Sequence, residues 1–271
     1  MRIAVAVGVL LLCWQAASAA AYDDFAQGIS ANAEDNSDLA IKSFTAAIAA
    51  PDLNHSLLPQ AYRGRAQAYL HEGKCHVALA DLDQAIKSNA TDWAALSLRA
   101  EARACDGDLA GAEADFSAAI AVKPAPALYI DRGRIRFRQQ NFSSAADDFA
   151  PHGEERHPPP YRVLWLEVAR RRGGTLDAKT AARDADAVDS DDWPAPLLAL
   201  YAAKLTSDAA LAAVKDGPDH QQCEADFYVG EWLLGGNDAA AARALLQKAA
   251  TDCPKNVVEY GEAQFELRHM K

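Results

Sequence analysis

The sequence predicts an all-α fold in which helical hairpins stack into a solenoid. Five segments place a small residue mid-way through a first helix, an Ala twelve residues later and a large apolar residue four residues after that. The small residue recurs after 34 residues from Ala66 to Ala100 and after 33 residues from Ala100 to Gly133, a period typical of helical repeats. Glu72-Gly73 and Asp106-Gly107 separate two helical runs with turn-forming residues. The five sets are Gly28/Ala40/Phe44/Ala47, Ala66/Ala78/Leu82/Ala85, Ala100/Ala112/Phe116/Ala119, Gly133/Ala145/Phe149 and Gly230/Ala242/Leu246/Ala249.

Close packing explains this alternation of small and bulky positions. Two antiparallel helices in contact need small residues where their backbones approach, and a bulky residue such as Phe116 fills the gap toward the neighbouring hairpin. Pro124 and Pro254 stand where a helix must stop. Each repeat therefore has the composition of two packed antiparallel helices.

These positions resemble the tetratricopeptide repeat (TPR), whose hairpins carry Trp/Tyr, Leu, Gly, Tyr, Ala, Phe, Ala and Pro in that order. Residues 59–92 match it at Tyr62, Ala66, Tyr69, Gly73, Ala78, Leu82 and Ala85, and residues 93–125 at Leu96, Ala100, Gly107, Ala112, Phe116, Ala119 and Pro124. The resemblance implies a right-handed superhelical solenoid of helical hairpins with a capping helix. We expect a signal peptide (1–20), four hairpins (21–159), an irregular helical linker segment (160–222), a further hairpin (223–256) and the cap (257–271).

Three repeats place an Arg beside the small position and an Asp just before the bulky one. These pairs are Arg65/Asp81, Arg99/Asp115 and Arg132/Asp148. The first and last repeats lose both members together, with Gln27/Ser43 and Val229/Leu245 in their place. A half-buried Arg without a carboxylate is costly, so we expect these charges to pair, within a hairpin or across to the next. A row of ligand-binding arginines is the alternative.

The N-terminus is typical of a secretory signal peptide. Met1-Arg2 precedes an apolar run from Ile3 to Leu12 and then small residues. The run is shorter than the roughly 20 residues needed to cross a bilayer, so we expect cleavage and no stable membrane insertion, with a retained anchor as the alternative. Removing Arg2 moves the net charge from −11 to −12, which argues against nucleic acid as a partner. We expect an exported, soluble chain.

Two pairs of cysteines remain after the signal peptide. Cys75 and Cys105 are 30 residues apart, as are Cys223 and Cys253, and each pair falls on helices that the repeat makes neighbours. In an oxidising compartment we expect both pairs to form disulfides. The alternative is a zinc site of His71, Cys75, His76 and Cys105, which the helix break at Gly73 disfavours. We expect no metal and no cofactor.

Residues 160–222 are predicted to be helical but off the repeat pattern. An apolar face runs through Leu164, Trp165 and Val168. The acidic stretch from Asp184 to Asp192 lacks the Gly and closing Glu of a calcium loop, so we interpret it as solvated linker. At the C-terminus, an amphipathic helix is expected to cover the last hairpin. Its apolar positions are Val257, Tyr260, Ala263, Leu267 and Met270.

The sequence favours surface recognition over catalysis. It has no Gly-x-Ser-x-Gly and no phosphate-cradling Gly loop, so we expect a protein that is not an enzyme. First helices of stacked hairpins line a concave groove in which peptides lie. The residues predicted to face it are Arg63, Gln67, Glu101, Arg134, Phe137 and Arg138. Arg134 and Arg138 are four residues apart and can capture a carboxylate or acidic peptide segment, with a solvated pair of arginines as the alternative.

The order of features in residues 126–271 resembles the NlpI family of periplasmic lipoproteins. The features are Tyr129 to Phe149 with an Arg-Gly, Leu164-Trp165-Leu166, Trp193, Phe227-Tyr228, Val258-Glu259 and Glu266-Leu267. The resemblance implies a bacterial periplasmic adaptor that docks a tail-specific protease and cell-wall hydrolases, often as a homodimer. Cys13 lacks the preceding small residues of a lipoprotein, which departs from that family. The alternative function is a structural subunit of an envelope protein assembly.

Overall fold

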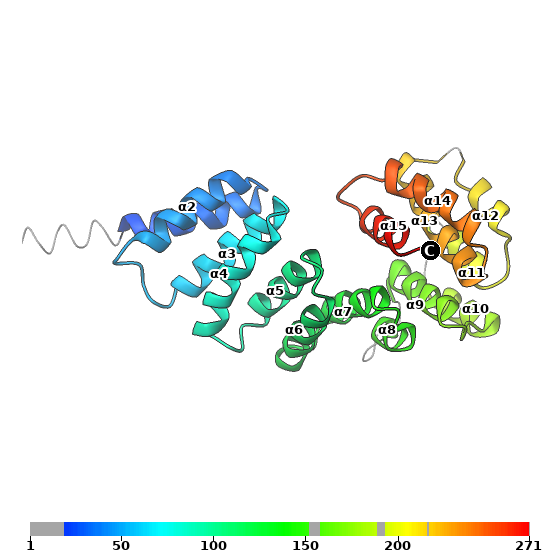
Figure 1. Ribbon diagram of the computed structural model, residues 1–271, viewed down its shortest axis with the longest axis horizontal. Helices are drawn as coiled ribbons and strands as arrows, with labels where there is room; N and C mark the ends of the chain where they lie inside the picture. Colours follow the sequence, from blue (N-terminus) through cyan, green and yellow to red (C-terminus); the bar gives the residue numbers. More distant parts are fainter. Residues whose placement is uncertain (1–18, 152–157, 189–192, 216, 271) are drawn as a thin grey trace, which may run out of the picture. The chain divides into compact units, whose positions relative to one another are not determined.

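The computed structural model describes residues 19–151, 158–188, 193–215 and 217–270, and within these ranges it consists of helices and their connections, without strands. A helix over residues 19–33 precedes α2 (Figure 1). The helices that follow are α2 (Ser37–Ala49), α3 (Leu58–His71), α4 (Cys75–Ser88), α5 (Trp93–Cys105), α6 (Leu109–Val122), α7 (Pro126–Arg138), α8 (Phe142–Phe149), α9 (Pro160–Arg172), α10 (Ala178–Asp186), α11 (Ala195–Tyr201), α12 (Ser207–Ala212), α13 (Asp219–Gly235), α14 (Ala239–Asp252) and α15 (Val258–His269). Two compact units divide the chain between Leu128 and Tyr129, here called the N-terminal and C-terminal units.

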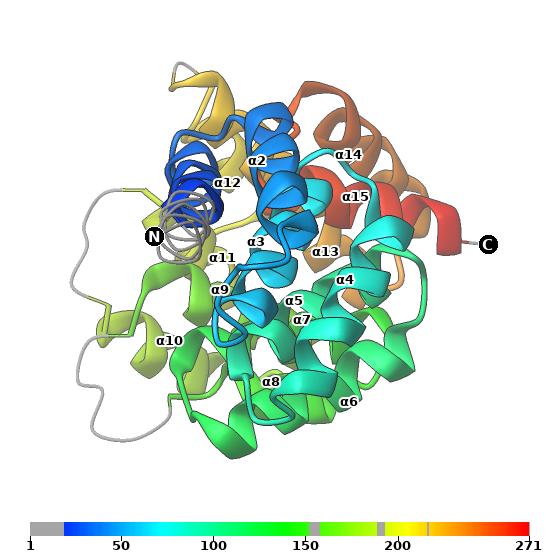
Figure 2. The same ribbon diagram turned by 90° about the vertical axis from the view of Figure 1, so that its left-hand side faces the viewer.

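The N-terminal unit is a succession of helical hairpins. α3 packs on α4 and α5 packs on α6, while α2 packs on α3 and α4 on α5, so neighbouring hairpins are in contact (Figures 1 and 2). Polar side chains cap the helices, as where Asp92 accepts hydrogen bonds from the first backbone amides of α5. Gly73 and Gly107 turn the chain between paired helices with φ of +70° and +89°, a region that glycine adopts without strain. The predicted hairpins and turns of this unit are confirmed.

Bulky residues lie against small ones at the hairpin seams, as predicted. A Cβ placed on Gly28 would lie 2.8 Å from the ring of Phe44, and one on Gly133 would lie 2.7 Å from the ring of Phe149. Ala78 and Ala112 are fully buried. The Phe44 ring also abuts Gly64 of the next hairpin, so it fills the gap between repeats.

The predicted Arg–Asp pairs form inside their hairpins. Arg65 and Arg99 each donate two hydrogen bonds of 2.8 Å to the Asp sixteen residues later, and Arg99 also reaches Asp83 of the preceding hairpin at 2.8 Å. In the first hairpin, the equivalent positions form a neutral bond in which the Ser43 hydroxyl donates to Gln27 at 2.9 Å. These arginines are therefore architectural and hold paired helices in register.

The C-terminal unit has a core of aromatic rings. Trp165 of α9 lies 5.4 Å from the ring of Phe137, 5.7 Å from Phe149 and 5.7 Å from Phe227, measured between centroids. Helix α9 packs against α8, α11 and α13. Although we expected a linker over 160–222, its first helix is an integral part of this core. Asp189, Asp191 and Asp192 of the expected acidic linker lie outside the described residues.

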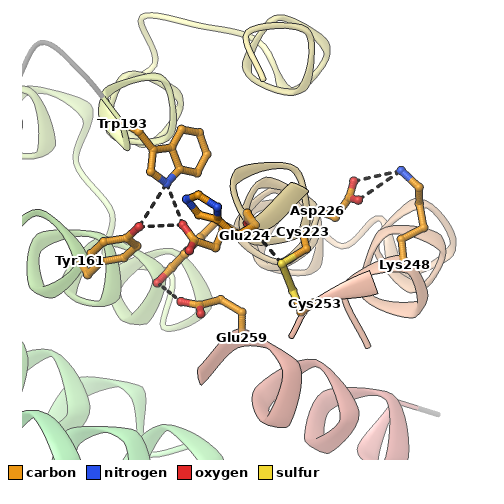
Figure 3. Close-up of a disulfide and its surroundings, with 10 residues drawn as sticks. Tyr161, Trp193, Cys223, Glu224, Asp226, Lys248, Cys253 and Glu259 are labelled. Carbon is orange, nitrogen blue, oxygen red and sulfur yellow. Dashed lines mark hydrogen bonds and ion pairs between the residues drawn. A yellow bond between two sulfur atoms is a disulfide. The ribbon is translucent and has the colours of Figure 1, made fainter. Parts of the chain in front are cut away.

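Both predicted disulfides are present. Cys75 is joined to Cys105 in the N-terminal unit, with a Cα–Cα distance of 6.0 Å. Cys223 is joined to Cys253 in the C-terminal unit, with a Cα–Cα distance of 5.1 Å (Figure 3). Because Cys75 and Cys105 are oxidised, they are not available as the thiolate ligands of the zinc alternative.

Residues 1–18, which contain the core of the predicted signal peptide and Cys13, lie outside the described residues. Among the helices that are described, none combines the length and apolar character that a membrane crossing requires.

Candidate peptide-binding site

A pocket of 430 Å³ opens in the C-terminal unit between α7, α9, α13 and the start of α15. Its apolar wall includes Ile130, Trp165, Val257 and Val258, and its polar wall includes Arg134, Tyr161, Glu224 and Glu259. Tyr161 is 38% exposed and Val258 is 37% exposed, which makes them two large hydrophobic residues open to solvent at one pocket. An apolar cavity with a few converging polar groups is the usual form of a ligand site.

One edge of the pocket is an ordered hydrogen-bonded cluster (Figure 3). Tyr161 Oη donates to Glu224 Oε2 at 2.7 Å, and Trp193 Nε1 donates to the same oxygen at 2.7 Å. Burial raises the pKa of Tyr161 well above its ordinary value, and the hydrogen bond to the Glu224 carboxylate raises it further. Tyr161 therefore remains a neutral donor, and Glu224 is held in place by two donors from separate segments.

Arg134 lines the same pocket and, together with Arg138, forms the arginine pair that the sequence singles out. Arg138 donates two hydrogen bonds of 2.9 Å to the carboxylate of Glu262 on α15. Arg134 donates to one oxygen of the same carboxylate at 3.3 and 3.4 Å, and its other terminal nitrogen lies 3.6 Å from Asp131. The prediction that the two arginines share a face is confirmed. The carboxylate that they hold in the structure belongs to this chain.

Helix α15 presents three glutamates to the rest of the unit. Glu259 accepts a hydrogen bond of 2.9 Å from Tyr228 Oη, and Glu266 is 3.3 Å from Arg172, which also binds Glu231 of α13. Residues 259, 262 and 266 are spaced three and four apart and so lie on one helix face. All three glutamates are buried, and burial raises the pKa of Glu259.

Phe137 is the one predicted groove residue whose placement the structure contradicts. Its side chain is 2% exposed and packs on Phe142 and Trp165, and the guanidinium of Arg172 lies 5.5 Å over its ring. The repeat position suggested a groove-facing side chain. The aromatic core of this unit takes Phe137 up instead, because α9 supplies rings that complete its packing.

The remaining predicted residues lie in the N-terminal unit. Arg63 binds Asp92 at 2.6 Å and lines a separate polar pocket of 530 Å³, while Gln67 on α3 is half-buried and Glu101 on α5 is exposed. The six candidates thus divide evenly between two units. Peptide binding by the N-terminal three stays a prediction.

Several site residues were not foreseen as such. Tyr161, Trp193 and Glu224 meet across separations of 31 to 63 residues, and nothing in the local sequence links them. A signal did exist for Glu262, because the spacing of Glu259, Glu262 and Glu266 marks an acidic face on the predicted capping helix.

No family model matches the sequence. Among solved structures, the chain is similar to a tetratricopeptide repeat protein from Parabacteroides merdae, with a TM-score of 0.64 and 16% identity over 91% of this chain and 98% of that one. It is also similar to the C-terminal part of a TPR repeat-containing protein from Cytophaga hutchinsonii, with a TM-score of 0.57 and 16% identity over 88% of this chain and 98% of that one. For a chain in the structure of the APC/C hetero-tetramer Cut9-Hcn1, the TM-score is 0.50 and the identity 15%, over 86% of this chain and 48% of that one.

These likenesses define an all-α protein with the tetratricopeptide repeat fold, as the sequence predicts. At this level of identity they establish the fold alone. What the chain binds has to be argued from its own pocket and charges.

Proposed function

We propose that this chain is a non-catalytic adaptor that holds a segment of a partner protein against its C-terminal unit. The observation that carries the proposal is the 430 Å³ pocket, which is walled by apolar side chains and bordered by the partly exposed guanidinium of Arg134. A large apolar side chain of a partner would enter beside Trp165 and Val258, where burial contributes about 25 cal/mol per Å² of apolar area. Anchors of this kind dominate the energy of protein interfaces.

The polar edges of the pocket would fix the orientation of the bound segment. Glu224 is held by two donors, and Arg134, which lines the same pocket, offers a cation. A peptide backbone or a charged side chain between them meets both an acceptor and a donor, which is how a small number of polar groups gives a mostly apolar site its specificity.

Fluorescence anisotropy with labelled peptides tests the proposal. We expect twelve-residue peptides that combine Leu or Phe with acidic residues to bind the full chain, and Val258→Asn to weaken binding about fivefold to tenfold because it places an amide in the apolar wall. Val122→Asn is the matched control, since Val122 is 43% exposed on α6 of the other unit. Equal affinity of both variants, or no binding of any peptide, would count against the proposal.

For the compartment and the partners, we propose a bacterial periplasmic adaptor that presents cell-wall hydrolases to a tail-specific protease. Its support is the signal-like N-terminus and the NlpI-like order of features in residues 126–271. The alternative is a permanent structural subunit of an envelope assembly. An adaptor should stimulate the protease at substoichiometric amounts, whereas a structural subunit should purify with its partners in a fixed ratio and stimulate nothing.

A further inference from the structure

Arg134 takes part in two sites at once. Its side chain lines the open pocket, and its Nε and Nη2 atoms donate to Glu262 of α15 at 3.4 and 3.3 Å. The Arg138 bonds to the same carboxylate are shorter, at 2.9 Å. Glu262 is therefore held mainly by Arg138, and Arg134 is the looser of its two partners.

Helix α15 does not depend on Arg134 for its position. Tyr260, Leu267 and Met270 pack against the hydrophobic core of the unit, Ala263 is fully buried, and α15 packs on α14. If Arg134 turned toward the pocket, Glu262 would keep both bonds from Arg138. Asp131, whose side chain is 33% exposed, would exchange its 3.6 Å contact with Arg134 for water.

Exchanging the Glu262 carboxylate for a partner's carboxylate at Arg134 also has a small electrostatic cost. The Arg134 side chain is 25% exposed, so water already reaches the guanidinium and weakens its attraction to Glu262. Ion pairs that are partly or fully buried return little net free energy, because desolvation offsets their attraction. A carboxylate that arrives in the pocket would thus compete for Arg134 on nearly equal terms.

We propose that Glu262 is an internal competitor for the partner, and that the partner is an acidic helical segment whose side-chain carboxylate binds Arg134 while a neighbouring apolar side chain fills the pocket. This inference rests on the proposed function and adds to it the partner's chemistry and a built-in restraint on affinity. Helix α15 supplies the template for such a partner. It carries glutamates spaced three and four apart together with Val258 and Phe265.

The probe follows from that template. A fluorescein-labelled peptide that copies Val258–His269, with both ends blocked, carries the acidic face and the apolar side chains and has no terminal charge. A second peptide with Gln at the positions of Glu259, Glu262 and Glu266 removes only the carboxylates. Binding of each to the full chain is measured by anisotropy at low and high salt.

Three variants of the full chain give distinct expected results. Glu262→Gln should tighten binding of the acidic probe about threefold, since it frees Arg134 from a charged competitor. Arg134→Gln should weaken it about tenfold and abolish the preference for the acidic probe over its Gln counterpart. Arg138→Gln should weaken it severalfold, since Glu262 would then rely on Arg134.

Arg103→Gln serves as the matched control. Arg103 is 27% exposed and bound to a buried carboxylate in the N-terminal unit, and its partner Asp115 keeps the bonds from Arg99. We expect this variant to bind the acidic probe like the wild type. Circular dichroism establishes whether each variant is folded. If Glu262→Gln does not fold, the binding of both probes to Arg134→Gln tests the inference by itself.

The outcomes separate this inference from the proposed function. Unchanged or weaker binding by Glu262→Gln, or a charge preference that survives Arg134→Gln, would overturn the inference. The proposed function would still stand if apolar peptides continued to bind in a Val258-dependent way. If the blocked acidic probe did not bind but the same peptide with a free C-terminus did, the inference would also be overturned, because the carboxylate would then come from the chain end.

Discussion

The two units use the same residue types over different distances along the chain. In the N-terminal unit, Arg65 and Arg99 bind carboxylates sixteen residues away, within one hairpin. The C-terminal unit keeps one such pair, Arg132 with Asp148. Its Arg138 and Arg172, however, bind glutamates that are 124 and 94 residues away. Pairs of the first kind repeat with the hairpin and fix local register, whereas pairs of the second kind tie the last helix of a unit to earlier ones.

The packing of the two units also differs, with local seams in one and a larger aromatic core in the other. Buried alanines and single bulky residues fill the seams of the N-terminal unit, while a cluster of aromatic rings around Trp165 fills the C-terminal unit. Each described carboxyl group whose pKa is raised lies in the C-terminal unit, and burial is the largest cause for each. These groups are Asp131, Glu167, Asp226, Glu231 and Glu259. The unit that contains the apolar pocket is thus also the one in which burial raises the pKa of carboxyl groups.

The largest expected effect is on the aromatic core. Trp165→Ala should lower the free energy of unfolding by about 3–5 kcal/mol, because it opens a cavity among Phe137, Phe149 and Phe227. Urea denaturation followed by circular dichroism measures the loss. Trp93→Ala is the matched control, since Trp93 is half-buried in the N-terminal unit and holds Lys123 over its ring at 4.0 Å. It should cost about 1 kcal/mol, and an equal loss in both variants would remove the contrast between the units.

A smaller effect on stability should come from the titration of Glu167. Burial raises the pKa of this carboxyl group to about 7. Because the folded pKa exceeds the unfolded one, the protonated group stabilises the fold below about pH 4.5, and this contribution is lost as the pH rises through 7. Glu167→Gln should remove that loss and make the variant more stable than the wild type at pH 8, by roughly 3 kcal/mol at most.

Urea denaturation across pH 4 to 8 measures this slope. Asp23→Asn, at an exposed carboxylate of the N-terminal unit, is the control for the loss of one negative charge. If Glu167→Gln kept the wild-type slope, the Glu167 carboxylate would not be the group responsible. Its position also argues for the effect, because one carboxylate oxygen is buried without a hydrogen-bond partner.

The sequence predicted well wherever a contact repeats with the hairpin. The period located the small and bulky positions, the sixteen-residue Arg–Asp pairs and the helices that bring Cys75 to Cys105. Helical spacing likewise predicted that Arg134 and Arg138 share a face, since residues four apart are neighbours on the surface of a helix. These contacts depend on local geometry, which periodicity encodes.

Contacts that depend on the irregular part of the chain were not predictable in this way. Phe137 holds a repeat position that suggested a groove, yet α9 buries it with Trp165. The meeting of Tyr161 and Trp193 at Glu224 joins three segments with no common period. The pocket therefore arises from tertiary packing that overrides the repeat, and sequence spacing carries no record of it.

The smallest expected effect concerns the close packing at the hairpin seam. Two glycine substitutions should change the free energy of unfolding in opposite directions. Gly133→Ala places a methyl group 2.7 Å from the Phe149 ring, which is fully buried and packed against Trp165. The ring cannot move aside, so the strain of about 1–3 kcal/mol should exceed the helix-propensity gain of about 1 kcal/mol. Gly261→Ala on α15 meets no atom within 4 Å and should stabilise the protein by about 1 kcal/mol. Thermal unfolding of both variants gives the signs, and stabilisation by Gly133→Ala would show that the seam tolerates a larger residue than its close packing implies.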